Sequence, residues 1–206
     1  MSNDATLPSG DDLATPLGTD FYLLDELLTE EERAFRDGVR ATCHERIAPI
    51  AGEYWNAGGI DDRMVKTYFD LGVAGIGLEE SGKGFSPLAE GMISLELARA
   101  DGALATFNAV HSALVMTSMS LLGDAEQKER WLPKLASGEI LGAMGLTEPT
   151  HGSDVVQLET TAVRDGDFYI LNGAKRWIGL ATVCDIVIVW ARDDDGKWGR
   201  RSPTVA

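Results

Sequence analysis

Cysteine, histidine and long apolar runs are scarce in this sequence, and each scarcity excludes a class of protein. The two cysteines, Cys43 and Cys184, lie far apart and form no CxxC pair, so we expect no disulfide. His44 and Glu45 begin an HExxH pattern that the next residues do not complete, so no metal site is predicted. No apolar run is long enough to cross a bilayer, and the N-terminus lacks the features of a secretion signal or transit peptide. We therefore expect a soluble, cytoplasmic protein.

Basic residues are missing from the first 32 positions, which hold nine acidic residues. The formal net charge of the 206-residue chain is −15. An acidic surface repels phosphate backbones, so nucleic-acid binding is not predicted. Residues 1–20 are rich in Ser, Thr, Pro, Gly and Asp, and we expect them to form a flexible acidic lead.

Helix signals fill residues 21–138, which we predict to be a helical domain. A capping box at Thr29–Glu32 begins a helix that should end or bend at Pro49 and Gly52. The further helices are predicted from Asp61 or Asp62 to Leu71, from Ser86 to Asp101, over 103–122 and from Asp124 through Leu135. The segment 103–122 is almost uncharged, which is typical of a helix in the middle of a bundle. His111 within it is expected to be a core histidine with satisfied hydrogen bonds.

Beyond Gly138 the pattern changes to short segments rich in β-branched and aromatic residues. The predicted strands are Ile140–Leu146, Glu159–Val163, Phe168–Leu171, Lys175–Ile178 and Asp185–Ala191, separated by turns at Asp165–Asp167 and, as a type I′ turn, at Asn172–Gly173. The fold class is therefore α+β, with an all-α helical bundle followed by an antiparallel β domain. No apolar return strand follows the turn signal at Asp193–Gly196. We expect residues 139–206 to be the start of a truncated domain, and the strand partner of Ile186–Trp190 to be missing or supplied elsewhere.

The densest group of residues suited to ligand binding is Gly145–Asp154. A strand leads into a Pro-bearing loop with two hydroxyls, a small glycine and nearby backbone amides, which suits an anionic or carbonyl-rich ligand. On composition alone, a structural capping loop is an equally good interpretation. A second element, Asn172–Ile178, follows and contains Gly-Ala-Lys-Arg-Trp-Ile.

Together these two elements resemble the signature of the acyl-CoA dehydrogenase family, and the segments Asp101–Ala105 and Gly123–Lys128 resemble its helical domain. The resemblance covers about residues 25–192. Within the family, the sequence of these motifs is most similar to the glutaryl-CoA dehydrogenase and short-chain acyl-CoA oxidase branch. It implies an N-terminal helical domain, a middle β domain and a C-terminal four-helix bundle, which this chain lacks. It also implies FAD as cofactor, an acyl-CoA substrate, electron-transfer flavoprotein or a similar acceptor as partner, and a homo-oligomer when full length.

The resemblance further implies the function and the site residues. The reaction is FAD-dependent α,β-dehydrogenation of an acyl-CoA thioester to trans-2-enoyl-CoA, with this chain as an inactive fragment. The residues expected to bind the flavin are Met144, Leu146, Thr147, Gly152, Ser153, Trp177, Ile178 and Gly179, and those expected near the substrate are Ser153 and Thr106. Preorganised donors near the flavin N1 favour hydride acceptance. The catalytic Glu of the family lies in the missing bundle, so no catalytic residue is assigned, and Glu148 is expected to be structural.

Two departures from the family pattern and three alternatives stay open. Gly179 replaces the usual Thr, so only a backbone amide is available there, and an acyl-CoA oxidase is an alternative. Ala105 stands where glutaryl-CoA enzymes carry an Arg, so a short or medium uncharged acyl chain is predicted. Trp177 alone also fits a core aromatic on a strand. The unfinished sheet also fits a non-catalytic interaction module that is completed by a partner chain.

Overall fold

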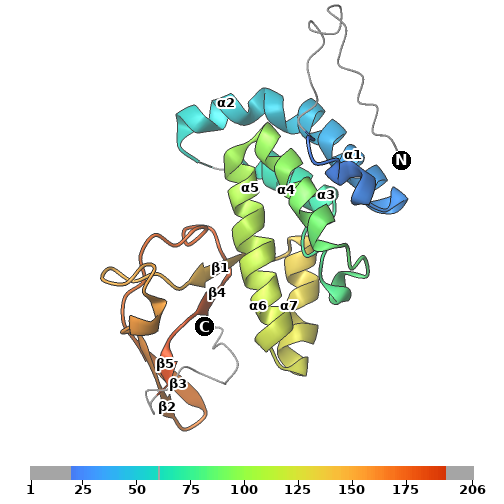
Figure 1. Cartoon of the computed structure of the whole chain (residues 1–206). Coiled ribbons are helices and arrows are strands. Elements are labelled where there is room, and N and C mark those ends of the chain that lie inside the picture. Colours follow the sequence, from blue (N-terminus) through green and yellow to red (C-terminus); the bar gives the residue numbers. More distant parts are fainter. Residues whose placement is uncertain (1–19, 60, 194–206) are drawn as a thin grey trace, which may run out of the picture.

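The computed structural model describes residues 20–59 and 61–193, and in this part of the chain the α-helices precede the strands (Figure 1). The α-helices are α1 (Glu30–Thr42), α2 (Ala48–Ala57), α3 (Asp62–Asp70), α4 (Pro87–Ala100), α5 (Gly102–Asn108), α6 (Thr117–Leu122) and α7 (Ala125–Ser137). The strands are β1 (Gly142–Gly145), β2 (Thr161–Asp165), β3 (Phe168–Asn172), β4 (Ile186–Val189) and β5 (Arg192–Asp193). This order confirms the α+β class that the sequence predicts.

The helices begin at the capping residues that the sequence predicts. Thr29 and Glu32 form a complete capping box at α1, and Asp124 and Gln127 form a second one at α7. Glu32 is buried, and its other carboxylate oxygen accepts a hydrogen bond from the amide of Ser86, 2.8 Å away, at the start of α4. One side chain therefore holds the N-terminal ends of two helices together.

The first helix continues past the residues that were expected to end it. A π-helical segment, Cys43–Ile47, joins α1 directly to α2, which runs to Ala57. Pro49 occupies the first turn of α2, directly after this π-helical segment. Of the prediction that Pro49 and Gly52 end or bend the helix, the end is therefore wrong, because the helix runs on to Ala57.

The uncharged segment forms one helix through the middle of the bundle, as expected. This central helix comprises α5, a π-helical segment (Ala109–Met116) and α6. Its core-facing side chains, together with those of the neighbouring helices, are fully buried: Ile93, Leu97, Leu104, Phe107, Val115, Met119 and Leu135. None of the helices within residues 20–59 and 61–193 is long and apolar enough to span a membrane.

The strands form two small sheets, and their pairing is mixed. β2 pairs with β3 in the predicted antiparallel direction, but β1–β4 and β2–β5 are parallel pairs. The expectation that the partner of Ile186–Trp190 is missing is wrong, because β4 pairs with β1 along its whole length. About 40 residues separate these two strands, which is enough for the crossover that a parallel pair requires. Figure 1 shows β1 and β4 beside the central helix, with β2, β3 and β5 further away.

Two local predictions in the β region are wrong. Lys175–Ile178 is not a strand, because its polar groups bond to the loop that follows β1 and Trp177 has a left-handed backbone. Asn172–Gly173 is not a type I′ turn, since Asn172 stays in β3 and Gly173 has φ +153°. The predicted lead at residues 1–20 and the turn at Asp193–Gly196 lie almost entirely outside the described residues.

Candidate functional site

The two sequence motifs meet in space. The ammonium group of Lys175 donates a hydrogen bond to the carbonyl of Leu146 at 3.0 Å. The next amide along the chain, that of Arg176, donates to the carbonyl of Thr147 at 2.9 Å. These bonds place the predicted flavin residues Leu146 and Thr147 beside the segment that carries Trp177. The sequence gives no direct signal for this pairing, because the two motifs are separated by the β2–β3 hairpin.

β1 and β4 share one set of backbone hydrogen bonds. The amide of Ile186 donates to the carbonyl of Leu141 at 3.1 Å. The amide of Trp190 donates to the carbonyl of Gly145 at 3.0 Å. Since the hydrogen-bonding groups of successive residues point in opposite directions, the odd-numbered residues of β1 face β4.

The even-numbered residues of β1 and its extension therefore face an open edge. The amide of Gly142 donates to the imidazole of His111, 3.3 Å away. The amides of Met144 and Leu146 point to the same side and have no hydrogen-bond partner among the described residues. Two backbone donors are thus available to a ligand at the position where the sequence predicts the flavin.

A buried ion pair shapes the loop after β1. Glu148 is 4% exposed, and its carboxylate accepts hydrogen bonds from the amides of Glu159 (2.6 Å) and Thr160 (2.9 Å) and from the Thr160 hydroxyl. The ammonium of Lys175 lies 2.8 Å from the same carboxylate. Glu148 is therefore structural, as expected, and it anchors the loop to both the start of β2 and the second motif.

This network makes stability depend on pH. Burial raises the pKa of Glu148, but the hydrogen bonds from Lys175, Thr160 and the two amides outweigh it and lower the pKa to about 2. In the unfolded chain the Glu148 carboxylate binds a proton near pH 4.5, so this stabilisation is present above that pH and is lost as pH falls from 4.5 towards 2.

We expect Glu148→Gln to make the free energy of unfolding less dependent on pH between 4.5 and 2, as measured by denaturant titration at several pH values. If the free energy of unfolding of Glu148→Gln depended on pH as strongly as that of the wild-type chain, Glu148 would not be the source of this dependence. Glu32→Gln is measured for comparison, because the pKa of Glu32 is also lowered to about 2.

Trp177 lies on the surface and not in the core. Its side chain is 78% exposed, its φ is +62°, and the guanidinium of Arg176 lies 4.3 Å from the ring centroid. A left-handed backbone at a bulky residue is strained, and such strain often marks functional sites. The alternative interpretation of Trp177 as a core aromatic is therefore wrong. Leu180, three residues later, also has a positive φ of +66°.

The remaining predicted residues lie around this turn and along the loop. Ile178 is half-buried, and Gly179 packs on the central helix, where an added Cβ would lie 3.2 Å from Val110. Thr106 lies one turn earlier on that helix, is exposed, and donates its hydroxyl to its own helix backbone at Gly102. The structure thus brings Gly179 to the helix that carries Thr106.

Gly152 and Ser153 are exposed in the loop after β1. No hydrogen bond joins either residue to Trp177 or Gly179 in the part of the chain that is described. An added Cβ at Gly152 would meet no atom within 4 Å, so the space around the loop is open. The Ser153 hydroxyl is therefore accessible to a ligand.

Donors without partners make this end of the β1–β4 pair suitable for a flavin. They are the amides of Met144 and Leu146, which have no partner among the described residues, and the exposed hydroxyl of Ser153. A flavin nucleotide offers carbonyl oxygens, ring nitrogens and phosphate oxygens as acceptors. The residues present therefore fit FAD.

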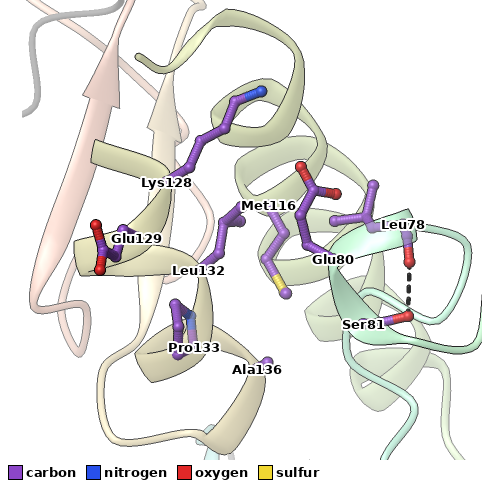
Figure 2. Close-up of a pocket in the computed structure, with 9 residues that line it drawn as sticks. All are labelled: Leu78, Glu80, Ser81, Met116, Lys128, Glu129, Leu132, Pro133 and Ala136. Carbon is purple, nitrogen blue, oxygen red and sulfur yellow. Dashed lines mark hydrogen bonds between the residues drawn. The ribbon is translucent and has the colours of Figure 1, made fainter. Parts of the chain in front are cut away.

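Another hollow of the molecule lies away from this site. Figure 2 shows a pocket of about 280 Å³ between α7, the central helix and the loop before α4. Met116 and Leu132 contribute apolar surface to it, and Glu80 and Lys128 contribute charged groups. None of the residues predicted from the sequence to bind the flavin or the substrate lines this pocket.

The chain matches two family models in sequence order. The model of the acyl-CoA dehydrogenase N-terminal domain matches residues 29–139, and that of the acyl-CoA dehydrogenase middle domain matches residues 143–205. The chain belongs to the acyl-CoA dehydrogenase family. Both matched domains meet at the loop before β1, so the candidate site lies within the matched region.

Relatives and solved structures agree with this assignment. Mitochondrial isovaleryl-CoA dehydrogenase from Pongo abelii is 37% identical over 171 residues, which cover 81% of this chain and 40% of the relative. A glutaryl-CoA dehydrogenase from Mycobacterium smegmatis in complex with FADH2 superposes with a TM-score of 0.80 and 35% identity, covering 84% of this chain and 45% of the other. A structure described as the electron transferring flavoprotein of Acidaminococcus fermentans superposes with a TM-score of 0.77 and 32% identity, with coverages of 83% and 46%. The chain therefore spans about 40% of the length of the curated relative.

Proposed function

We propose that this chain forms the flavin-facing half of an acyl-CoA dehydrogenase that converts an acyl-CoA thioester to a trans-2-enoyl-CoA. The observation that carries the proposal is the meeting of the two motifs beside the open edge of β1. FAD would bind along Met144, Leu146, Thr147, Gly152, Ser153, Trp177, Ile178 and Gly179, and when bound it supplies the hydride acceptor. The side chains of the two motifs hold and orient that group.

The substrate and partners follow from the same proposal. Thr106 and Ser153 would lie near the acyl-CoA, and Ala105 offers no cation for a distal carboxylate. Burying an unpaired carboxylate is unfavourable, so we propose a short or medium uncharged acyl chain. We also propose that the complete protein is a homo-oligomer and passes electrons to an electron-transfer flavoprotein.

Replacing Trp177 tests the cofactor assignment. The chain is equilibrated with FAD and desalted, and the retained flavin is measured from its visible absorption band. We expect Trp177→Ala to weaken FAD affinity by about tenfold or more, because an aromatic packing surface is lost. Trp55→Ala is the matched control, since Trp55 is 86% exposed but lies on α2. Equal effects of the two substitutions would contradict the role of Trp177, and a wild-type chain that retains no flavin would contradict binding by this half alone.

An exposed apolar face favours a second candidate function, an interaction module completed by another chain. Val163, Phe168 and Ile170 share one face of the β2–β3 hairpin and are 42%, 77% and 48% exposed. Exposed apolar surface of this kind is typical of an interface. Purification at native expression level followed by mass measurement separates the candidates, because a module would carry a stoichiometric partner chain. A monodisperse chain of 22.2 kDa would contradict the module.

A further inference from the structure

His111 joins three elements of the fold. Its Nε2 lies 2.9 Å from the carbonyl of Leu135 on α7, and its Nδ1 lies 3.3 Å from the amide of Gly142 on β1. The residue itself lies in the π-helical segment of the central helix. Its imidazole is fully buried, stacks on Phe107 and meets the edge of Phe69. The prediction of a core histidine with satisfied hydrogen bonds is confirmed.

The partners determine which nitrogen carries the proton. A carbonyl can only accept a hydrogen bond, so Nε2 carries the hydrogen and donates it to Leu135. Nδ1 is then unprotonated and accepts from the Gly142 amide. Burial lowers the pKa of His111, which is consistent with the neutral form. The ring thus presents one donor to the helical domain and one acceptor to β1.

The Gly142 contact bears directly on the edge where the flavin would bind. Gly142 faces the same side of β1 as Met144 and Leu146, whose amides have no partner within residues 20–59 and 61–193. Gly142 also approaches the central helix so closely that an added Cβ would lie 2.5 Å from the Cγ1 of Val115. β1 is therefore held against the helix at Gly142 by one hydrogen bond and by close packing.

We propose that His111 is a positioning residue for the flavin: its Nδ1 holds the Gly142 amide and so sets where the free donors of β1 lie. This inference rests on the proposed function, because it assigns those donors to FAD. A π-helical segment within an α-helix often occurs at a functional site, and here it carries the imidazole that reaches β1.

Two conservative variants separate the two contacts of the ring. In His111→Asn, the side-chain oxygen occupies the position of Nδ1 and can accept from Gly142, but the donor to Leu135 is lost. In His111→Gln, the side-chain nitrogen reaches the position of Nε2 and can donate to Leu135, but nothing accepts from Gly142. Each variant loses one buried hydrogen bond, so both should be destabilised to a similar degree.

The test measures amide hydrogen exchange in β1 and FAD affinity for both variants and for the wild-type chain. We expect His111→Gln to speed exchange over Gly142–Leu146 and to weaken FAD affinity, each by about tenfold or more, with α7 exchange unchanged. His111→Asn should keep both near the wild-type values despite its lower stability. Equal effects of the two variants on β1 exchange would overturn the inference.

The exchange measurement also separates this inference from the proposed function. If the wild-type chain retains no FAD, the proposed function of this half fails, while the difference in β1 exchange still decides whether His111 positions the strand. As a further readout, the imidazole nitrogen chemical shifts of the wild-type chain should show Nδ1 without a proton. A protonated Nδ1 would overturn the inference regardless of FAD.

Discussion

Replacing Lys175 with methionine is expected to lower the free energy of unfolding by about 3–5 kcal/mol, measured by denaturant titration. The side chain of Lys175 is 13% exposed and that of Glu148 is 2% exposed, so the ion pair between them is shielded from water. Removal of the cation leaves a buried carboxylate with only the hydrogen bonds from Glu159 and Thr160. The carbonyl of Leu146 also loses its donor, so the open edge of β1 should become less ordered, and FAD retention should fall with stability.

The matched control for this substitution is an exposed pair of the same type. Lys66 and Asp70 lie 2.7 Å apart on α3, with 72% and 41% of their side chains exposed. Lys66→Met should change the free energy of unfolding by about 0.5 kcal/mol or less. The double variant Glu148→Gln, Lys175→Met should recover part of the loss, because no buried charge is left unpaired. Similar effects of Lys66→Met and Lys175→Met would show that the buried pair does not hold the loop.

The helical half could be predicted closely because its signals are local. Thr29, Asp61, Ser86, Asp101 and Asp124 each cap a helix through a hydrogen bond to an amide two or three residues away. Such bonds depend only on neighbouring residues, so the sequence shows them. The π-helical segments could not be predicted in this way, since they depend on packing against other helices.

The β half was harder to predict because its partners are far apart in the sequence. β1 pairs with β4 across about 40 residues, and no local pattern distinguishes this parallel pair from an edge strand that lacks a partner. The apolar Trp177 and Ile178 suggest a strand, but the backbone there follows the hydrogen bonds to Leu146 and Thr147. Here tertiary contacts override local propensity.

The sequence predicted which two segments form the candidate site but not the side-chain bonds that hold them, and the flavin-binding roles of its residues stay a prediction. The family resemblance named the loop after β1 and the segment with Trp177, and the structure places these two segments side by side. The resemblance did not reveal that Lys175 and Glu148 join the two motifs, or that His111 reaches Gly142. These are side-chain bonds between elements that are 27 and 31 residues apart, so no spacing in the sequence predicts them.

Gly173→Ala is expected to lower the free energy of unfolding by about 2–5 kcal/mol, for two physical reasons. Its φ of +153° is a conformation that residues with a side chain rarely adopt. An added Cβ would lie 2.4 Å from the hydroxyl of Thr160 and 2.7 Å from its Cα, which is part of the backbone and cannot rotate away. Because the Thr160 hydroxyl and amide bond Glu148, any shift there would also disturb the loop that carries the candidate flavin residues.

Gly166→Ala separates the backbone effect from the steric one. Gly166 lies in the turn between β2 and β3 with φ +62°, and an added Cβ there would meet no atom within 4 Å. We expect this variant to lose about 1–2 kcal/mol from backbone strain alone. If Gly173→Ala loses no more than Gly166→Ala, the close approach to Thr160 has no energetic consequence. If Gly173→Ala loses more free energy of unfolding than Gly166→Ala and also retains less FAD, the start of β2 supports the flavin loop through Glu148. This conclusion follows because Gly173 itself faces Thr160 and not the open edge of β1.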